Sequence, residues 1–147
     1  MASYLDLDAD GVARTGLLFL DGDELEKAVI DKFGQVDYDF VYFNRVKADV
    51  MRIEKINPSL QLTAVVWQRH LENENFMYPM VAGNSLPREG YSYAPVNAKA
   101  RAAFNGSFGE VLDRGGVKSH YYPLYNSSHE ITGVLELLAG ERSANDI

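Results

Sequence analysis

The chain has 147 residues, of which 46% are hydrophobic and 24% are charged, and its net charge is −7. This length is typical of one domain that can bury a core without disulfides or structural metals. The acidic charge argues against nucleic acid and anionic lipid as partners, because both require clustered lysine and arginine. No cysteine is present, which excludes disulfides, thiolate zinc sites and cysteine nucleophiles. No apolar run approaches the roughly 20 residues that span a bilayer.

An acidic segment opens the chain. From Asp6 to Gly11 it matches D-x-D-x-D-G, the first half of a calcium-binding loop. Such a loop needs a bidentate carboxylate at its twelfth position, and that position is Leu17. We therefore expect a solvated acidic turn, and whether the carboxylates from Asp6 to Asp10 bind a cation stays open. Residues 12–20 are apolar and fit either the end of a helix or a strand.

Two helices are predicted next. Asp21, Asp23 and Glu24 suit the start of a short helix over residues 24–32, because a carboxylate there accepts hydrogen bonds from free backbone N–H groups. Residues 37–56 form the strongest predicted helix, since apolar residues recur at spacings of three or four before a proline ends the pattern. Its apolar stripe consists of Phe40, Phe43, Val46, Val50 and Ile53.

The rest of the chain predicts strands and one short helix. Apolar alternation, polar turns and the Gly115-Gly116 pair delimit the strands. A loop over residues 83–93 precedes a short helix over residues 97–104. The five strands cover residues 60–69, 76–82, 108–112, 117–125 and 131–139. This order predicts an α+β fold, in which a five-stranded antiparallel sheet carries the long helix on one face.

Several stretches stand out by their order and spacing. They read LDGDELEKAV, RIEKINPSL, the two paired strands that follow it, AKARAAFNGSFGEV and HYYPLYNSSHEITGVLELL. Together they resemble a single Cache domain, a PAS-like sensory module of bacterial transmembrane receptors. The resemblance covers about residues 22–140, with 1–21 as an N-terminal helix stub or turn and 141–147 as a tail. It implies the strand order 2-1-5-4-3 of PAS-like folds.

The resemblance also implies a function. It indicates a domain that senses a small molecule, is not itself an enzyme, and belongs to a membrane-anchored receptor such as a histidine kinase or chemoreceptor. The domain would lie in the periplasm or outside the cell, with the membrane anchors beyond this chain, and a homodimer is one assembly open to it. Two alternatives stay open: a cytoplasmic PAS-like interaction module without a ligand, and a small enzyme with an unrecognised site.

Aromatic and basic residues mark the expected ligand site. In Cache domains the ligand lies between the sheet and the segment after the second strand, which corresponds here to residues 80–99. Trp67 and Arg69 are two positions apart on one strand, so both point to the same face. There Arg69 could pair with a ligand carboxylate; alternatively, Trp67 belongs to the core and Arg69 pairs with a surface acid. The expected ligand-binding residues are Trp67, Arg69, Tyr78, Tyr91, Tyr93 and Tyr121.

We expect no catalytic residue, bound metal or cofactor. None of the histidines, His70, His120 and His129, has a histidine partner three or four residues away, as a helical metal pair requires. Ser127 and Ser128 lie outside any G-x-S-x-G nucleophile motif. No glycine-rich phosphate loop is present.

Overall fold

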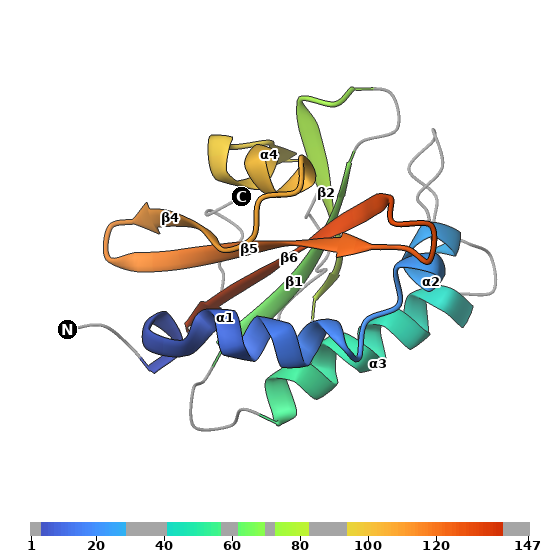
Figure 1. Ribbon diagram of the computed structural model, residues 1–147, viewed down its shortest axis with the longest axis horizontal. Helices are drawn as coiled ribbons and strands as arrows, with labels where there is room; N and C mark the ends of the chain where they lie inside the picture. Colours follow the sequence, from blue (N-terminus) through green and yellow to red (C-terminus); the bar gives the residue numbers. More distant parts are fainter. Residues whose placement is uncertain (1–3, 29–40, 57–61, 70–72, 83–93, 140–147) are drawn as a thin grey trace.

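The computed structural model describes residues 4–28, 41–56, 62–69, 73–82 and 94–139 (Figure 1). Within them, helices pack on both faces of one antiparallel sheet: α1, α2 and α3 on one face and α4 on the other. The helices are α1 (Tyr4–Leu17), α2 (Gly22–Lys27), α3 (Val41–Lys55) and α4 (Ala98–Phe104). The strands are β1 (Leu62–Arg69), β2 (Phe76–Ala82), β3 (Ala94–Pro95), β4 (Glu110–Arg114), β5 (Val117–Tyr125) and β6 (Ile131–Ala139).

Within the described residues the sheet has six strands, in the order β3-β2-β1-β6-β5-β4. Without β3, this is the order 2-1-5-4-3 that the resemblance implies, so the α+β class and the PAS-like strand order are confirmed. The prediction of five strands missed β3, which contains only Ala94 and Pro95 and pairs with the start of β2. A two-residue strand is too short to show an alternating pattern in the sequence.

The predicted strand bounds are confirmed for β2, β5 and β6, and for β1 as far as it lies in the described residues. Strand β4 begins at Glu110 rather than at Phe108 and ends at Arg114 rather than at Leu112. Gly109, which precedes β4, has a φ of 84° and donates its N–H to the carbonyl of Tyr121. A residue in this left-handed conformation interrupts the regular ladder, so the strand starts only after Gly109.

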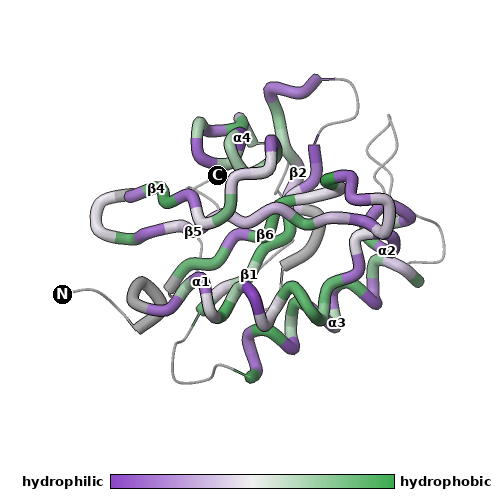
Figure 2. The backbone as a smooth tube through the Cα atoms, viewed as in Figure 1, coloured by the Kyte–Doolittle hydropathy of each residue, from purple (hydrophilic) through white to green (hydrophobic). Residues whose placement is uncertain are grey.

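The core has one layer on each face of the sheet. Alternate residues of β1 contribute to the two layers, with Ala64 and Val66 packed beneath the helices and Val65 and Trp67 packed beneath α4. This is the division of faces that alternation in the sequence predicts. Figure 2 shows hydrophobic residues along β1, β6 and the inner side of α3.

Helix α3 packs on the sheet as predicted. Val46, Val50 and Ile53 are buried, and Phe43 packs partly buried against the same layer. Phe40, the first residue of the predicted stripe, lies outside the described residues. The shorter predicted helix, over residues 24–32, is wrong in its bounds, because α2 covers Gly22–Lys27 and Ala28 is its C-cap. Among the described residues, no helix is long and apolar enough to cross a bilayer.

The predicted acidic turn near the N-terminus is wrong, because these residues lie within α1. The helix is interrupted only at Asp8, where φ is −138° and ψ is 27°. Ala9, Val12 and Ala13 recur on one side of α1 and are buried in the core. Burial of this stripe outweighs the cost of Gly11 in a helix, about 1 kcal/mol.

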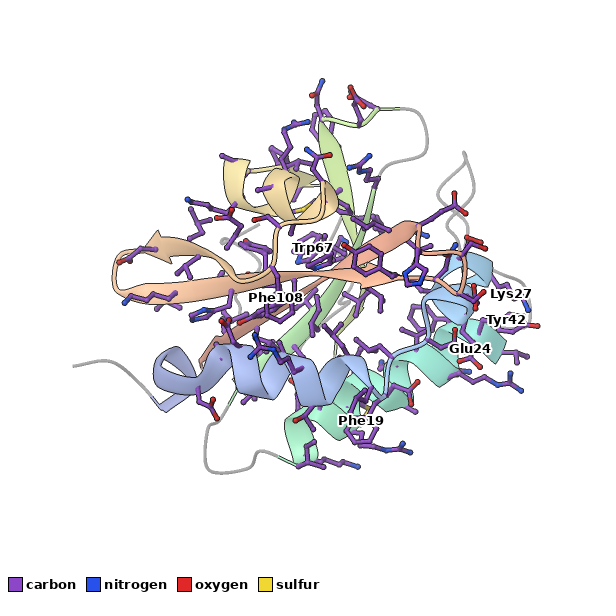
Figure 3. All side chains as sticks on the ribbon, in the orientation of Figure 1. Phe19, Glu24, Lys27, Tyr42, Trp67 and Phe108 are labelled. Carbon is purple, nitrogen blue, oxygen red and sulfur yellow. The ribbon has the colours of Figure 1, made fainter. Side chains whose placement is uncertain are left out.

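Polar and aromatic contacts tie α1 to β5. The Tyr122 hydroxyl donates a hydrogen bond of 2.9 Å to Asp10 Oδ1. The ring of Phe108 packs edge-on against Tyr122, with 4.7 Å between the ring centroids, and the guanidinium carbon of Arg14 lies 5.1 Å from the Phe108 centroid. Figure 3 shows Phe108 between the sheet and α1.

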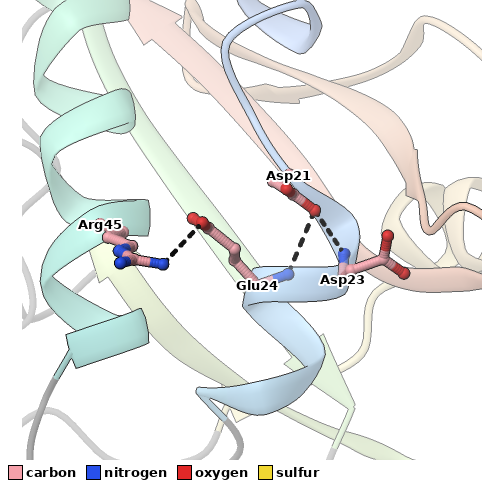
Figure 4. A network of polar contacts seen from close by, with 4 residues as sticks. All are labelled: Asp21, Asp23, Glu24 and Arg45. Atoms are coloured by element: carbon pink, nitrogen blue, oxygen red, sulfur yellow. Dashed lines mark hydrogen bonds and ion pairs between the residues drawn. The ribbon is translucent and has the colours of Figure 1, made fainter.

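Helix α2 begins where the sequence predicts a cap. Asp21 Oδ1 accepts hydrogen bonds from the backbone N–H groups of Asp23, at 2.9 Å, and Glu24, at 3.2 Å (Figure 4). Glu24 also pairs with Arg45 of α3 at 3.4 Å. At Gly22 the backbone approaches the β5–β6 turn so closely that a Cβ atom would collide with the carbonyl of Tyr125. The start of α2 is therefore fixed against both α3 and the sheet.

Candidate functional site

The strand register places a carboxylate in the middle of the α4 face of the sheet. Glu136 on β6 lies opposite Val65 of β1 on one side and Tyr121 of β5 on the other. One step along the same face, Leu138 lies between Thr63 and Ser119. Cross-strand neighbours point to the same face, so polar side chains from three strands lie together there.

Glu136 and Trp67 form a buried polar pair. Trp67 Nε1 donates a hydrogen bond of 2.7 Å to Glu136 Oε1, and both residues are 0% exposed. Figure 3 shows Trp67 on the side of the sheet that α4 covers. A carboxylate is seldom fully buried without partners, because leaving water costs free energy that only hydrogen bonds offset.

The N-terminus of α4 is joined to the same cluster. Asn97 caps α4, since its Oδ1 accepts a hydrogen bond of 2.8 Å from the Ala100 N–H. Its Nδ2 donates to the hydroxyl of Tyr121 at 3.2 Å. Tyr121 is 0% exposed and packs with Trp67 in the layer beneath α4.

Arg69 lies at the opposite end of α4. Its Nη2 donates to the carbonyl oxygen of Phe104, the last residue of the helix, at 3.1 Å and to Asn105 Oδ1 at 3.5 Å. The guanidinium carbon lies 4.9 Å from the centroid of the Phe104 ring. A cation near the C-terminus of a helix is favourable, because the last carbonyl groups carry partial negative charge.

A hollow of about 240 Å³ opens beside Arg69. Arg101 of α4 also faces it and donates through Nη2 to Asn75 Oδ1 at 3.3 Å. Two guanidinium groups and one carboxylate therefore border the same small space. Its lining residues are Arg69, Glu74, Val96, Arg101, Phe104 and Asn105.

The structure brings together three of the predicted ligand-binding residues, Trp67, Arg69 and Tyr121, on the α4 face. The placement of Tyr78 on that face is wrong. The register pairs Tyr78 with Gln68 and Met77 with Arg69, so Met77 points toward α4 and Tyr78 packs in the layer beneath the other helices. This register decides which residues of β2 share a face with Trp67 and Arg69 of β1, and it shifts by one residue at a bulge after Val66. Tyr91 and Tyr93 lie outside the described residues.

Glu136 was not predicted as a site residue. The last strand has the sequence of an apolar run, and Glu136 is the single acid among residues 134–138. An acid at this place in a buried strand is a signal, because an ionised side chain there needs specific partners. Arg101, within the predicted short helix, was not predicted as a site residue either.

Two further hollows lie on the other face of the sheet. One, of about 320 Å³, lies between α1 and the β4–β5 hairpin, and its lining includes Asp8, Arg14 and His120. The other, of about 470 Å³, contains four carboxylates, those of Asp21, Asp23, Glu24 and Asp49. Burial raises the pKa of Asp49; Arg52 lowers it, and the carboxylates of Glu24 and Asp21 raise it. No group of three or more histidine and acidic side chains suited to a metal ion occurs within the described residues.

Comparisons with known proteins find no protein family and no curated protein sequence that matches this chain. Several solved structures are similar in part. A GAF domain of nlh2 from A. aeolicus in an inactive state has 10% identity and a TM-score of 0.47 over 91% of this chain and 85% of that one. A second GAF domain has 10% identity and a TM-score of 0.46 over 98% and 81%.

The third similar structure is the extracellular domain of a candidate histidine kinase, mmHK1S-Z3. It has 12% identity and a TM-score of 0.39 over 90% of this chain and 54% of its own length. All three TM-scores lie below 0.5, so these similarities carry no argument about function. The assignment to an α+β, PAS-like sheet rests on the strand order and the packing described above.

Proposed function

We propose that this chain is a sensor domain that binds a small anion in the hollow beside Arg69. In this proposal the domain is not an enzyme and belongs to a membrane-anchored bacterial receptor, outside the cytoplasm, as the resemblance to a single Cache domain implies. The observation that carries the proposal is the hollow itself, in which two guanidinium groups, from Arg69 and Arg101, face about 240 Å³ of space.

The chemistry of the hollow favours a carboxylate. A guanidinium group has five N–H donors in a fixed plane and can bind a carboxylate through two parallel hydrogen bonds. The described protein contacts of Arg69 and Arg101 each use Nη2. The hollow is smaller than the roughly 300–1,000 Å³ of a typical drug-sized site, so a carboxylate of a few carbon atoms fits it best.

The position of the hollow suits a sensor. Arg69 contacts the last carbonyl of α4, and Asn97 joins the first turn of α4 to Tyr121. A ligand that binds the other N–H groups of Arg69 would shift the guanidinium group whose Nη2 donates to the Phe104 carbonyl. Binding would therefore change how α4 sits on the sheet, which is the kind of two-state shift that a receptor can transmit.

A thermal-shift titration with acetate, pyruvate, succinate and citrate tests the proposal. A ligand at about 100 times its Kd stabilises the folded state by about 2.7 kcal/mol, so one of these acids should raise the Tm. Arg101→Ala and Arg69→Ala should abolish this shift. Arg45→Ala is the matched control, because Arg45 is an exposed arginine with one acidic partner outside the hollow. If none of the acids raises the Tm, the proposal fails.

A ligand-free interaction module in the cytoplasm is the second candidate. The observation that favours it is the complete burial of Trp67 and Tyr121 by other side chains, which fills the middle of the face where the ligand was expected. Absence of any carboxylate-dependent shift, together with unchanged stability of Arg101→Ala, would favour this module over the sensor.

A further inference from the structure

Strand β4 forms one end of the sheet. In the described part of the chain it pairs with β5 on one side and has no strand on the other. Figure 1 shows the β4–β5 hairpin extending beyond the helices. Edge strands present unpaired backbone N–H and C=O groups, which can pair with another chain.

The geometry of the hairpin determines which residues of β4 direct their backbone N–H and C=O groups away from β5. Gly115 and Gly116 form a two-residue turn, with φ values of 64° and 96°, so Arg114 and Val117 close the hairpin as a hydrogen-bonded pair. Hydrogen-bonded and non-hydrogen-bonded pairs alternate along an antiparallel ladder. The backbone groups of Val111 and Asp113 therefore point away from β5. The side chain of Val111 is 38% exposed.

The sequence of β4 is complementary to itself. Consider two copies whose β4 strands pair antiparallel about a twofold axis. Cross-strand partners must share a face of the sheet, so the axis passes through one residue, which then lies opposite the same residue of the other copy. With Leu112 at the centre, Val111 of each copy lies opposite Asp113 of the other, and each such pair exchanges two backbone hydrogen bonds. The same register sets Glu110 opposite Arg114, an oppositely charged pair.

The neighbouring registers are worse. With Asp113 at the centre, two carboxylates of like charge lie opposite each other, which is destabilising. With Val111 at the centre, Asp113 lies opposite Gly109, whose N–H already donates inward to the Tyr121 carbonyl. The register centred on Leu112 is the one that satisfies both the backbone groups and the charges.

The carboxylate of Glu110 is already held at this edge. Its Oε1 accepts a hydrogen bond of 2.8 Å from Ser107 Oγ, and its Oε2 lies 3.6 Å from Lys99 Nζ. We propose that two copies of this chain associate through antiparallel pairing of their β4 strands, centred on Leu112, to form one continuous sheet. This inference is independent of the ligand proposal above, since neither the hollow nor Arg69 takes part.

Sedimentation equilibrium of the full chain over a range of concentrations tests the proposal. The wild type should show a monomer–dimer equilibrium, and Val111→Pro should weaken the dimer by about tenfold or more, because proline removes an N–H that points out of the sheet. Proline is tolerated at such edge positions, and circular dichroism checks that the variant folds. Val111→Ala is the matched control, since it shortens the side chain but keeps the N–H, and it should still dimerise.

Charge reversal supplies a second test that does not depend on a proline variant. Glu110→Lys and Arg114→Glu should each weaken the dimer, and the double variant should restore it. The double variant is not expected to regain stability through an ion pair within one copy, because residues 110 and 114 lie about 13 Å apart along one strand. A monomer at every concentration overturns the proposal. So does a folded Val111→Pro variant that dimerises like the wild type, or a double variant no better than the single ones.

Discussion

The two faces of the sheet are built differently, and strand β6 shows the contrast best. Leu135 and Leu137 point toward the helices α1 to α3 and lie in an apolar layer. Val134 and Glu136 point toward α4, where a fully buried carboxylate lies beside an indole. Along β6, the side under three helices is thus apolar, while the side under one short helix buries a carboxylate. The helix-covered face also buries polar residues, but these lie on other elements: Glu54, Gln68 and His120. Under the proposed function, the ligand would act on the α4 face, away from the apolar layer under α1 to α3.

The largest expected effect lies on the helix-covered face. Leu135→Ala removes a side chain that is completely buried, so it should lower the free energy of unfolding by about 2–5 kcal/mol. Urea denaturation measures this loss. The control is Leu18→Ala, because Leu18 is 85% exposed and its truncation should change stability by less than about 0.5 kcal/mol. Similar losses in both variants would contradict the assignment of the core.

A smaller effect is expected on the α4 face. Trp67→Phe removes the donor to Glu136 and leaves a buried carboxylate with one hydrogen bond fewer, which should cost about 1–3 kcal/mol. In a Glu136→Gln background the same change should cost less, because the acceptor is no longer charged. A double-mutant cycle by chemical denaturation measures the difference. Equal costs in both backgrounds would mean that the charge of Glu136 does not stabilise the pair.

The same contrast explains how much the sequence could predict. The helix-covered face follows from local rules: Val46 and Val50 recur at helical spacing, and Ala64 and Val66 alternate along a strand, so the helix and its face of the sheet were predicted. The site on the other face depends on register and tertiary contacts. Tyr78 was assigned to the wrong face because a bulge shifts the pairing of β2 with β1 by one residue, which moves Tyr78 to the other side of the sheet.

Elements with weak local signals were also missed. Strand β3 has two residues, and α1 contains an acidic pattern that suggests a turn. What decides α1 is burial of Ala9, Val12 and Ala13 against the sheet, a tertiary effect that outweighs local preference. The hollow beside Arg69 brings together residues from β1, the segment before β2 and α4, and no spacing in the sequence indicates that they meet.

A pH-dependent effect is expected where α1 meets the sheet. Burial raises the pKa of Tyr122, and so do its hydrogen bond to Asp10 and the charge of that carboxylate. The unfolded chain ionises this tyrosine near pH 10, whereas the folded protein keeps it protonated. Its contribution to stability is therefore complete below about pH 10 and is lost as the pH rises further, by at most about 1.4 kcal/mol per pH unit. Tyr122→Phe should lower stability at pH 7 and flatten this alkaline loss in denaturation measured between pH 8 and 11. An unchanged alkaline slope would contradict the role of Tyr122.

The smallest expected effect concerns the acidic hollow on the helix-covered face. Burial and the nearby carboxylates raise the pKa of Asp49, although Arg52 opposes them. A raised pKa means that folding favours the protonated form, so the charged form at neutral pH costs stability, and this cost disappears once Asp49 is protonated at low pH. Asp49→Asn should therefore stabilise the protein at pH 7 by only a few tenths of a kcal/mol, since solvent screens this partly exposed group. Urea denaturation of both proteins should show this gain at pH 7 and none at pH 3.

Asp113→Asn is the control outside this hollow, because Asp113 is exposed on β4 and its Oδ1 accepts a hydrogen bond from the Gly116 N–H. This variant should give no gain at pH 7. A loss of stability in Asp49→Asn at neutral pH would show instead that the pairing of Asp49 with Arg52 outweighs the repulsion within the hollow.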